Sequence, residues 1–258
     1  MKKHLLFLLI IMFYGCTESN LAFHPRLNPS NGTLELVQAF GGSKNDVAKS
    51  VVSTADGGFA VLGYTQSLDG DITDKATEDY DFWMLKFNSE AQLEWNKTYG
   101  GSGDDRGSSL IETSDGGYAL LGYSDSSDGD VSSNNGNRDF WLVKINASGV
   151  LSWEKSFGYE GVDEGVSIIE TSDNHLMLSG VLDVTASGGE GNQGRFSTKH
   201  AGGDYWSIKI TPTGDIVWSR FYGGSFTDSP TGISETLIGG FINVGGSDSN
   251  DVDISNNK

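Results

Sequence analysis

An internal repeat of about 59 residues organises the chain from residue 34 to residue 258. An aromatic-Gly-Gly-Ser motif starts at Phe40, Tyr99 and Tyr222, and a weaker copy starts at Phe157, so the units are 59, 58 and 65 residues apart. All six tryptophans keep the same step: Trp83, Trp141 and Trp206 close Asp-aromatic-Trp triplets, and Trp95, Trp153 and Trp218 each follow twelve residues later. Such periodicity is typical of units that bury their apolar faces against one another. We therefore expect the tryptophans to be structural core residues.

The hydrophobic pattern inside each unit predicts strands and no helices. Residues 151–157 have a period of two, with Leu151, Trp153, Lys155 and Phe157 on one side and polar residues on the other. By contrast, residues 59–63 and 118–122 are apolar on both faces, as in a strand between two neighbouring sheets. Asp-Gly-Gly at 56–58 and 115–117 supplies tight turns between strands. Four short strands per unit predict an all-β fold, a β-propeller of four-stranded antiparallel blades.

The last unit contains fewer strand patterns than the others. We place the units at about 40–98, 99–156, 157–221 and 222–258, and the fourth has no Asp-aromatic-Trp segment. This predicts three full blades and a partial one. Residues 34–40 align with a fourth strand, so we expect them to be donated to the last blade; a four-bladed ring that closes imperfectly is the alternative.

The N-terminus has the pattern of an export signal. Lys2 and Lys3 precede an apolar run from residue 5 to residue 13, and Gly15 precedes Cys16, the single cysteine. We predict a lipoprotein signal peptide over 1–15, lipidation of Cys16 and a flexible spacer over 16–33. The alternative is an ordinary cleaved signal with an incidental cysteine. The expected location is the cell envelope, as an outer-membrane lipoprotein that is periplasmic or surface-exposed, with the lipid as its membrane contact.

The charge balance restricts the partners. The chain has 35 acidic and 17 basic residues and a formal net charge of −18. Such a charge opposes binding to nucleic acid and to anionic lipid.

The repeated motifs resemble a family of propeller-like repeat proteins exported by Gram-negative bacteria. The resemblance rests on Tyr-Gly-Gly-Ser, Asp-Gly-Gly-Tyr, Asp-Gly-Asp, Asp-Phe-Trp-x-x-Lys and the later Trp, and it covers residues 34–258. Many members of that family are lipoproteins or substrates of the type IX secretion system, and some are described as lectin-like or linked to polysaccharide degradation. The resemblance implies an architecture and says little about activity. The third unit departs from it, because Asn174-His175 replaces the double glycine.

One aspartate recurs eight residues before the threonine of each unit. These residues are Asp46, Asp105, Asp163 and Asp228. Aspartate readily accepts backbone N–H bonds in turns, so we expect a structural role in the loop that begins each unit.

A second acidic set lies between the second and third strands of three units. It comprises Asp69, Asp71, Asp128, Asp130, Asp251 and Asp253. Carboxylates that alternate in a glycine-containing turn resemble the oxygen clusters that bind Ca²⁺. The spacing is not that of an EF-hand, so a solvated acidic turn is the alternative. Calcium is the one cofactor that this pattern suggests.

The third unit carries an insertion between Gly180 and Asp204. It contains the basic and aromatic cluster Arg195, Phe196, Lys199 and His200. Long loops on rigid scaffolds often bind ligands, although tolerated insertions look similar.

No nucleophile elbow, zinc spacing or phosphate-binding loop occurs in the sequence. We therefore expect a non-enzymatic binding or adhesion module for a glycan or protein partner at the cell envelope. Abundant carboxylates keep a second hypothesis open, a hydrolase of envelope polysaccharide or an accessory subunit of one. A third hypothesis is a truncated gene product without independent function.

Overall fold

The computed structural model describes residues 37–192 and 200–255, and these residues form strands and no helices. The first sheet contains β1 (Asp46–Ser53), β2 (Phe59–Thr65), β3 (Asp81–Phe87) and β4 (Leu93–Tyr99). The second contains β5 (Asp105–Glu112), β6 (Tyr118–Ser124), β7 (Asp139–Ile145) and β8 (Leu151–Phe157). The third contains β9 (Glu164–Glu170), β10 (Leu176–Asp183), β11 (Gly203–Ile210) and β12 (Ile216–Tyr222), and the fourth contains β13 (Asp228–Glu235) and β14 (Phe241–Ser247).

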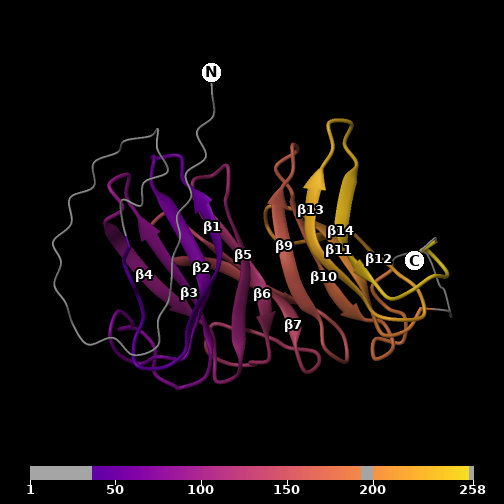
Figure 1. The fold of residues 1–258 in the computed structure, drawn as a ribbon, viewed down its shortest axis with the longest axis horizontal. Helices are drawn as coiled ribbons and strands as arrows, with labels where there is room; N and C mark the ends of the chain where they lie inside the picture. Colours follow the sequence, from indigo (N-terminus) through magenta and orange to yellow (C-terminus); the bar gives the residue numbers. More distant parts are fainter. Residues whose placement is uncertain (1–36, 193–199, 256–258) are drawn as a thin grey trace.

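Each sheet is an antiparallel meander in which consecutive strands pair. The sheets stand side by side in chain order (Figure 1), and the first strand of each unit contacts the preceding sheet. The predicted all-β fold is confirmed, as are three four-stranded units followed by a two-stranded one among the described residues. In this part of the chain no helix has the length and apolar character needed to span a membrane.

The predicted strand over residues 34–40 is only partly within the described residues. Residues 37–40 are not in a strand. Phe40 instead packs edge-on against Phe87 of the first sheet, with ring centroids 5.1 Å apart. The described part of this segment therefore makes its apolar contact at the first sheet and not at the last.

The third unit makes its first turn without a double glycine. Asn174 adopts a φ of 61°, in the left-handed region that Gly57 and Gly116 occupy in the first two units. Asparagine tolerates this conformation because its short polar side chain can bond locally. The turn therefore survives the change in sequence.

The core lies between the sheets, and the second and third strands supply most of it. Every residue of β3 and β7 is buried. Trp141 packs edge-on against Phe82 of the preceding sheet at 4.7 Å, and Trp206 packs in the same way against Phe140 at 5.0 Å. The fourth-strand tryptophans are only half-buried, because they lie on the outermost strand of each sheet: Trp95, Trp153 and Trp218.

Glutamates at the ends of first strands join each sheet to the one before it. The Glu170 carboxylate accepts bonds from the Ser114 N–H and hydroxyl, at 2.8 and 2.7 Å. Glu235 does the same for Ser172, and Glu112 accepts the Ala55 N–H. The first sheet has Ser53 at this position. Each unit from the second onward thus supplies a hydrogen-bond acceptor to a turn of the unit before it.

Candidate functional site

Each unit begins with a glycine-rich turn, which we call the leading turn, and aspartates bind its backbone N–H groups. In the second unit Asp105 Oδ2 accepts the Gly101 N–H at 2.7 Å, and Asp128 Oδ1 accepts the Ser102 N–H at 2.7 Å. Asp46 and Asp69 do the same in the first unit, and Asp228 and Asp251 in the fourth. In the third unit Asp163 Oδ2 accepts the Tyr159 N–H at 2.8 Å.

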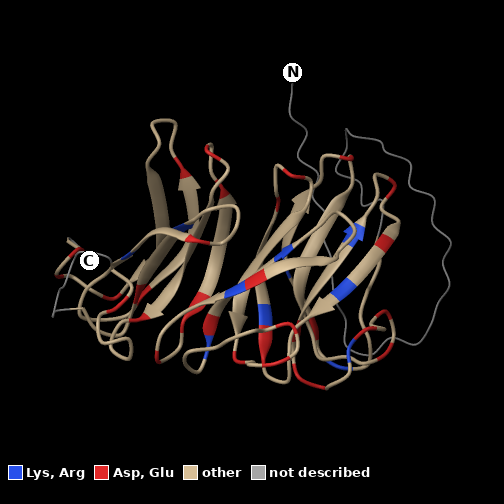
Figure 2. Ribbon diagram, turned by 180° about the vertical axis from the view of Figure 1, so that it is seen from behind, with Lys and Arg blue, Asp and Glu red and all other residues tan. Residues whose placement is uncertain are grey.

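Five of the six carboxylates suggested for calcium accept backbone N–H bonds of this kind. Asp71 accepts the Gly41 N–H and Asp130 accepts the Gly100 N–H, while the Asp253 N–H donates to the Gly223 carbonyl. Within residues 37–192 and 200–255 no three His, Cys, Asp or Glu side chains are grouped as metal ligands. Calcium binding at these loops stays a prediction, and an ion there would have to compete with backbone N–H donors. Figure 2 shows the acidic residues in loops at both ends of the strands.

Buried carboxylates also meet in pairs where two sheets join. An aspartate in the first two residues of the third strand of one unit lies beside the leading-turn aspartate of the next, across a glycine. The pairs are Asp81 with Asp105 across Gly100, Asp139 with Asp163 across Gly158, and Asp204 with Asp228 across Gly223. At Gly100, a Cβ atom would lie 2.5 Å from Asp81 Oδ1 and 2.7 Å from Asp105 Oδ2. Glycine is therefore required there.

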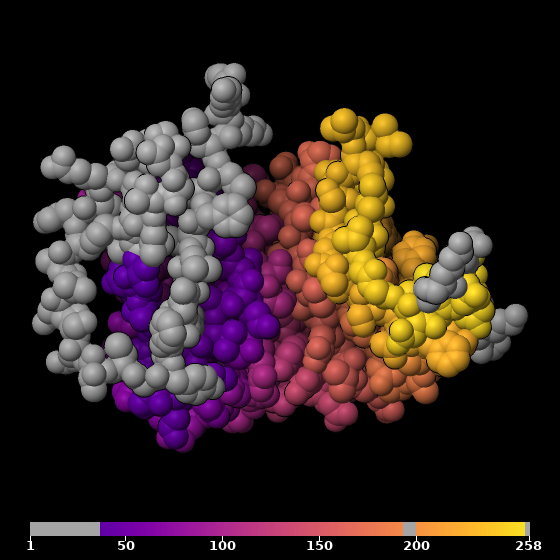
Figure 3. Space-filling model, viewed as in Figure 1, coloured from indigo at the N-terminus to yellow at the C-terminus, as the bar shows by residue number. Residues whose placement is uncertain are grey.

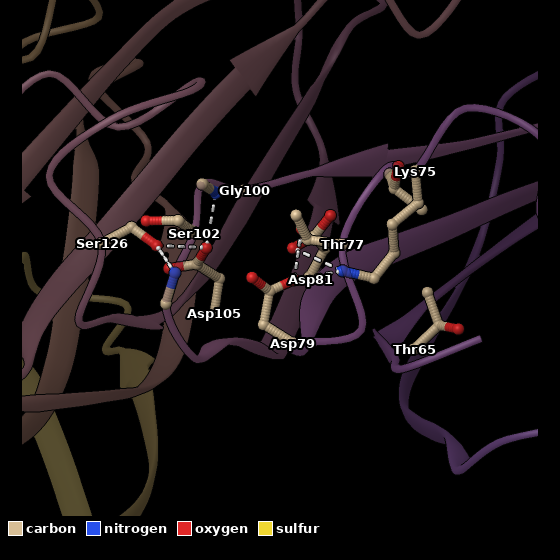
Figure 4. Close-up of polar contacts among 12 residues, drawn as sticks. Thr65, Lys75, Thr77, Asp79, Asp81, Gly100, Ser102, Asp105 and Ser126 are labelled. Carbon is tan, nitrogen blue, oxygen red and sulfur yellow. Dashed lines mark hydrogen bonds and ion pairs between the residues drawn. The ribbon is translucent and has the colours of Figure 1, made fainter. Parts of the chain in front are cut away.

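Two of the three junctions contain a basic side chain. In the first junction the buried Lys75 Nζ lies 3.0 Å from Asp81 Oδ1 and 2.7 Å from Asp79 Oδ1 (Figure 4). In the third junction His200 Nδ1 lies 2.5 Å from Asp204 Oδ2, and His200 Nε2 lies 3.6 Å from Asp253 Oδ2. These side chains place a proton donor against otherwise repelling carboxylates.

The middle junction lacks such a partner among the described residues. Asp139 is fully buried, its Oδ2 accepts the Asn135 N–H at 2.7 Å, and its Oδ1 has no hydrogen-bond partner in the described part of the chain. A buried, unpaired carboxylate oxygen is costly. Aspartates of the other two junctions also have an Oδ1 atom without a hydrogen-bond partner. The middle junction differs from them electrostatically because it has no basic side chain among the described residues.

Burial raises the pKa of five aspartates at these junctions and is the largest cause of each shift. It raises the pKa of Asp105 to about 6 and that of Asp81 to about 7, where Lys75 opposes the shift. The pKa of Asp163 also rises to about 7, and burial raises that of Asp139. The pKa of Asp204 reaches about 7 although the hydrogen bond from His200 lowers it.

The insertion of the third unit is only partly described. Arg195, Phe196 and Lys199 lie outside the described residues, so their predicted role in binding has no structural account. His200 is 2% exposed at its side chain and pairs with Asp204. It therefore contributes to the junction between the last two sheets, and its predicted role in a binding loop stays a prediction.

The rest of the insertion borders a hollow of about 400 Å³. Asn135 of the second unit and Tyr159 of the third-unit leading turn face Ser187 of the insertion there, and Glu160 and Glu190 are the charged residues of its lining. Tyr159 is half-buried, with its ring 5.8 Å from that of Trp206. An aromatic ring beside amide, hydroxyl and carboxylate groups can hold a polar ligand in a fixed orientation.

Sequence reasoning missed Tyr159 and the paired carboxylates. The pairs have a signal that could have revealed them, since each third-strand aspartate precedes its partner by 24 residues in every unit. Tyr159 has no such signal, because it stands where the other units have a glycine.

No protein-family model and no curated protein matches the chain.

Proposed function

We propose that the protein is a non-enzymatic binding or adhesion module of the propeller type, anchored at the cell envelope through Cys16. Its ligand is a glycan or a protein segment, and the hollow beside the third-unit insertion is the binding site. Stacked four-stranded sheets whose inner strands are buried on both faces support the propeller architecture.

The observation that carries this proposal is the position of the hollow. It lies where an insertion interrupts the repeat, and it combines Tyr159 with exposed polar groups of two units. Repeated residues serve the scaffold, whereas departures from a repeat on a rigid scaffold are where binding function concentrates. The acidic lining, Glu160 and Glu190, favours a neutral or cationic ligand.

A glycan array probed with the full-length chain tests the proposal. We expect binding to a subset of glycans that Tyr159→Ala weakens about tenfold, the usual effect of losing an aromatic anchor. Phe226→Ala is the matched control, because Phe226 is a 62% exposed aromatic of the fourth-unit leading turn, outside the hollow. Equal weakening by both variants, or binding that neither changes, would rule out the hollow as the site.

A hydrolase is the second candidate, and one observation favours it. Asp139 and Asp163 form a carboxyl pair with raised pKa values beneath Asn135 and Gly158, which line the hollow. Against it, both carboxyls are 0% exposed, and equivalent pairs recur at the other two junctions. Hydrolysis of an envelope polysaccharide that Asp139→Asn abolishes in a folded protein would replace the first candidate with this one.

A further inference from the structure

The hairpin that joins β13 to β14 carries two aliphatic side chains at its tip. Leu237 is 107% exposed and Ile238 is 96% exposed, the highest values among the exposed large hydrophobic residues that the structure describes. Figure 3 shows this hairpin, in yellow, projecting from the edge of the molecule. Single exposed aliphatic side chains are common on proteins, whereas neighbours that gather at a surface often mark a site of interaction.

The backbone of this turn does not require aliphatic residues. Gly239 has a φ of 82°, and its counterpart Gly116 in the second unit has a φ of 80°. The Thr236 N–H donates to the Gly240 carbonyl at 2.7 Å, and the corresponding bond of the second unit is 2.9 Å long. The same turn therefore forms with either kind of side chain at its tip.

The other units have small or polar residues at the two tip positions. The pairs are Ala55 with Asp56, Ser114 with Asp115, and Ser172 with Asp173. The three aspartates pair with third-strand lysines of their own sheets: Lys86, Lys144 and Lys209. These tips are exposed although a further unit follows each of them. Exposure at the tip thus comes from the projection of the turn, and the fourth unit differs by being apolar there.

The hairpin of the fourth unit is also almost without charge. Glu235 is the one charged residue between Ser229 and Ser247. Its carboxylate is engaged below the tip, where it accepts bonds from the Ser172 N–H and hydroxyl at 2.7 and 2.9 Å. Moving a charged side chain out of water is costly, so an aspartate at the tip would oppose entry into an apolar medium. The tip of the fourth unit carries no such charge.

The size of the apolar tip favours a lipid bilayer over a protein partner. A stable protein interface buries about 800 Å² on each side, far more than two side chains on one turn can supply. A bilayer makes no such demand, because each aliphatic side chain that enters its apolar region adds a favourable contribution of its own.

We propose that Leu237 and Ile238 insert into the apolar region of a lipid bilayer, as a membrane contact of the folded domain. The contact does not depend on a lipid at Cys16, on the hollow or on its ligand. The net charge of −18 repels anionic headgroups, so the tip enters bilayers of zwitterionic lipids in preference to anionic ones.

A fluorophore at the tip reports whether it enters lipid. Cys16→Ser removes the single cysteine of the full-length chain, and Ile238→Cys then provides the site for a nitrobenzoxadiazole label. With vesicles of phosphatidylcholine that has brominated acyl chains, we expect the label to emit at shorter wavelength and to be quenched. Replacing part of the phosphatidylcholine by phosphatidylglycerol should weaken both changes. Residues 1–15 stay in every sample, so differences between labelled positions report the folded domain.

The matched control position is Phe226, which is 62% exposed and lies at the opposite end of β13. A label on Phe226→Cys should be neither shifted nor quenched. Leu237→Ser in the protein labelled at 238 should lower the ratio of quenched to unquenched label at saturating lipid about tenfold, the effect of losing one inserted aliphatic side chain. Phe226→Ser should leave that ratio unchanged.

Leu237→Ser gives the tip the serine of the second and third units, and circular dichroism checks that each variant is folded. Equal quenching at 238 and 226 would overturn the proposal, as would an unchanged ratio in Leu237→Ser. A tip that serves a protein partner would remain unquenched by the vesicles, which would overturn it as well. If Leu237→Ser does not fold, the comparison of the two labelled positions decides.

Discussion

Asp139 and Asp163 lie on either side of Gly158 without a basic side chain of the described residues between them, whereas Lys75 and His200 serve the two equivalent pairs. The three junctions thus share one backbone arrangement, but only the first and third have a basic side chain beside the carboxyl pair. This contrast allows the energetic effect of the basic side chain to be measured within one molecule.

Asp139→Asn should stabilise the protein at pH 8. The substitution removes one of two buried carboxylates that repel each other. It also replaces a carboxyl group whose Oδ1 has no hydrogen-bond partner with an uncharged amide. We expect the free energy of unfolding to rise by about 1 kcal/mol, the scale of one pKa unit. Asp81→Asn is the control. It should lower the free energy of unfolding, because the buried Lys75 ammonium loses the charge of its carboxylate partner. Urea denaturation of both variants tests this; a loss of stability in Asp139→Asn would contradict it.

The stability of the protein should fall between about pH 5 and pH 8. The pKa values of four buried aspartates rise from 3.8 to about 6 or 7 on folding: Asp81, Asp105, Asp163 and Asp204. A raised carboxyl pKa means that the folded state holds the proton more tightly, so the stabilisation is complete below pH 3.8 and is lost as the pH passes 6 to 7.

The exposed turn aspartates act in the opposite direction at lower pH. Hydrogen bonds from Thr113 and Lys144 lower the pKa of Asp115 to about 2 although burial opposes the shift. The stabilisation that Asp115 provides is present above pH 3.8 and is lost as the pH falls towards 2. Urea midpoints measured from pH 4 to pH 8 should therefore peak between about 4 and 6. A urea midpoint that increases from pH 6 to pH 8 would contradict this, because it would mean that ionisation of the junction carboxyls does not destabilise the folded protein.

Glu170→Ala should weaken the contact between the second and third sheets. It leaves the Ser114 N–H and hydroxyl without their acceptor, and we expect a loss of about 1 kcal/mol in the free energy of unfolding. Ser53→Ala at the same repeat position of the first sheet is the control and should change it by less than about 0.5 kcal/mol. Denaturant titration measures both, and similar losses would mean that the glutamate does not join the sheets.

Gly122→Ala should destabilise the second sheet by about 2 kcal/mol or more. The added Cβ would meet the Arg106 carbonyl and would lie 2.8 Å from Phe82 Cζ, in the closely packed space between two sheets. Gly246→Ala is the control, because no atom lies within 4 Å of the corresponding Cβ position. Thermal melts should show a lowered Tm for the first variant and an unchanged one for the second.

The sheets could be predicted from the sequence because strands and hairpins depend on residues that are close together in the chain. Alternating residues in 151–157 and the turn glycines at 57 and 116 determine strands and hairpins locally. The carboxyl junctions were harder to recognise, because Asp81 and Asp105 belong to different units and become neighbours only when the sheets stack. The burial of His200 was not predicted, because sequence alone does not show that a side chain four residues before Asp204 turns inward.

The glutamate bonds between neighbouring sheets run in one direction along the chain, since each glutamate completes a turn in the unit that precedes it. Wherever the N-terminal units become free to fold first, the turn N–H groups of each new sheet lack their glutamate acceptor until the next unit has emerged. Folding in that direction should therefore lag by one repeat. A chaperone that holds the most recent unit would protect the part of the chain most exposed to misassembly.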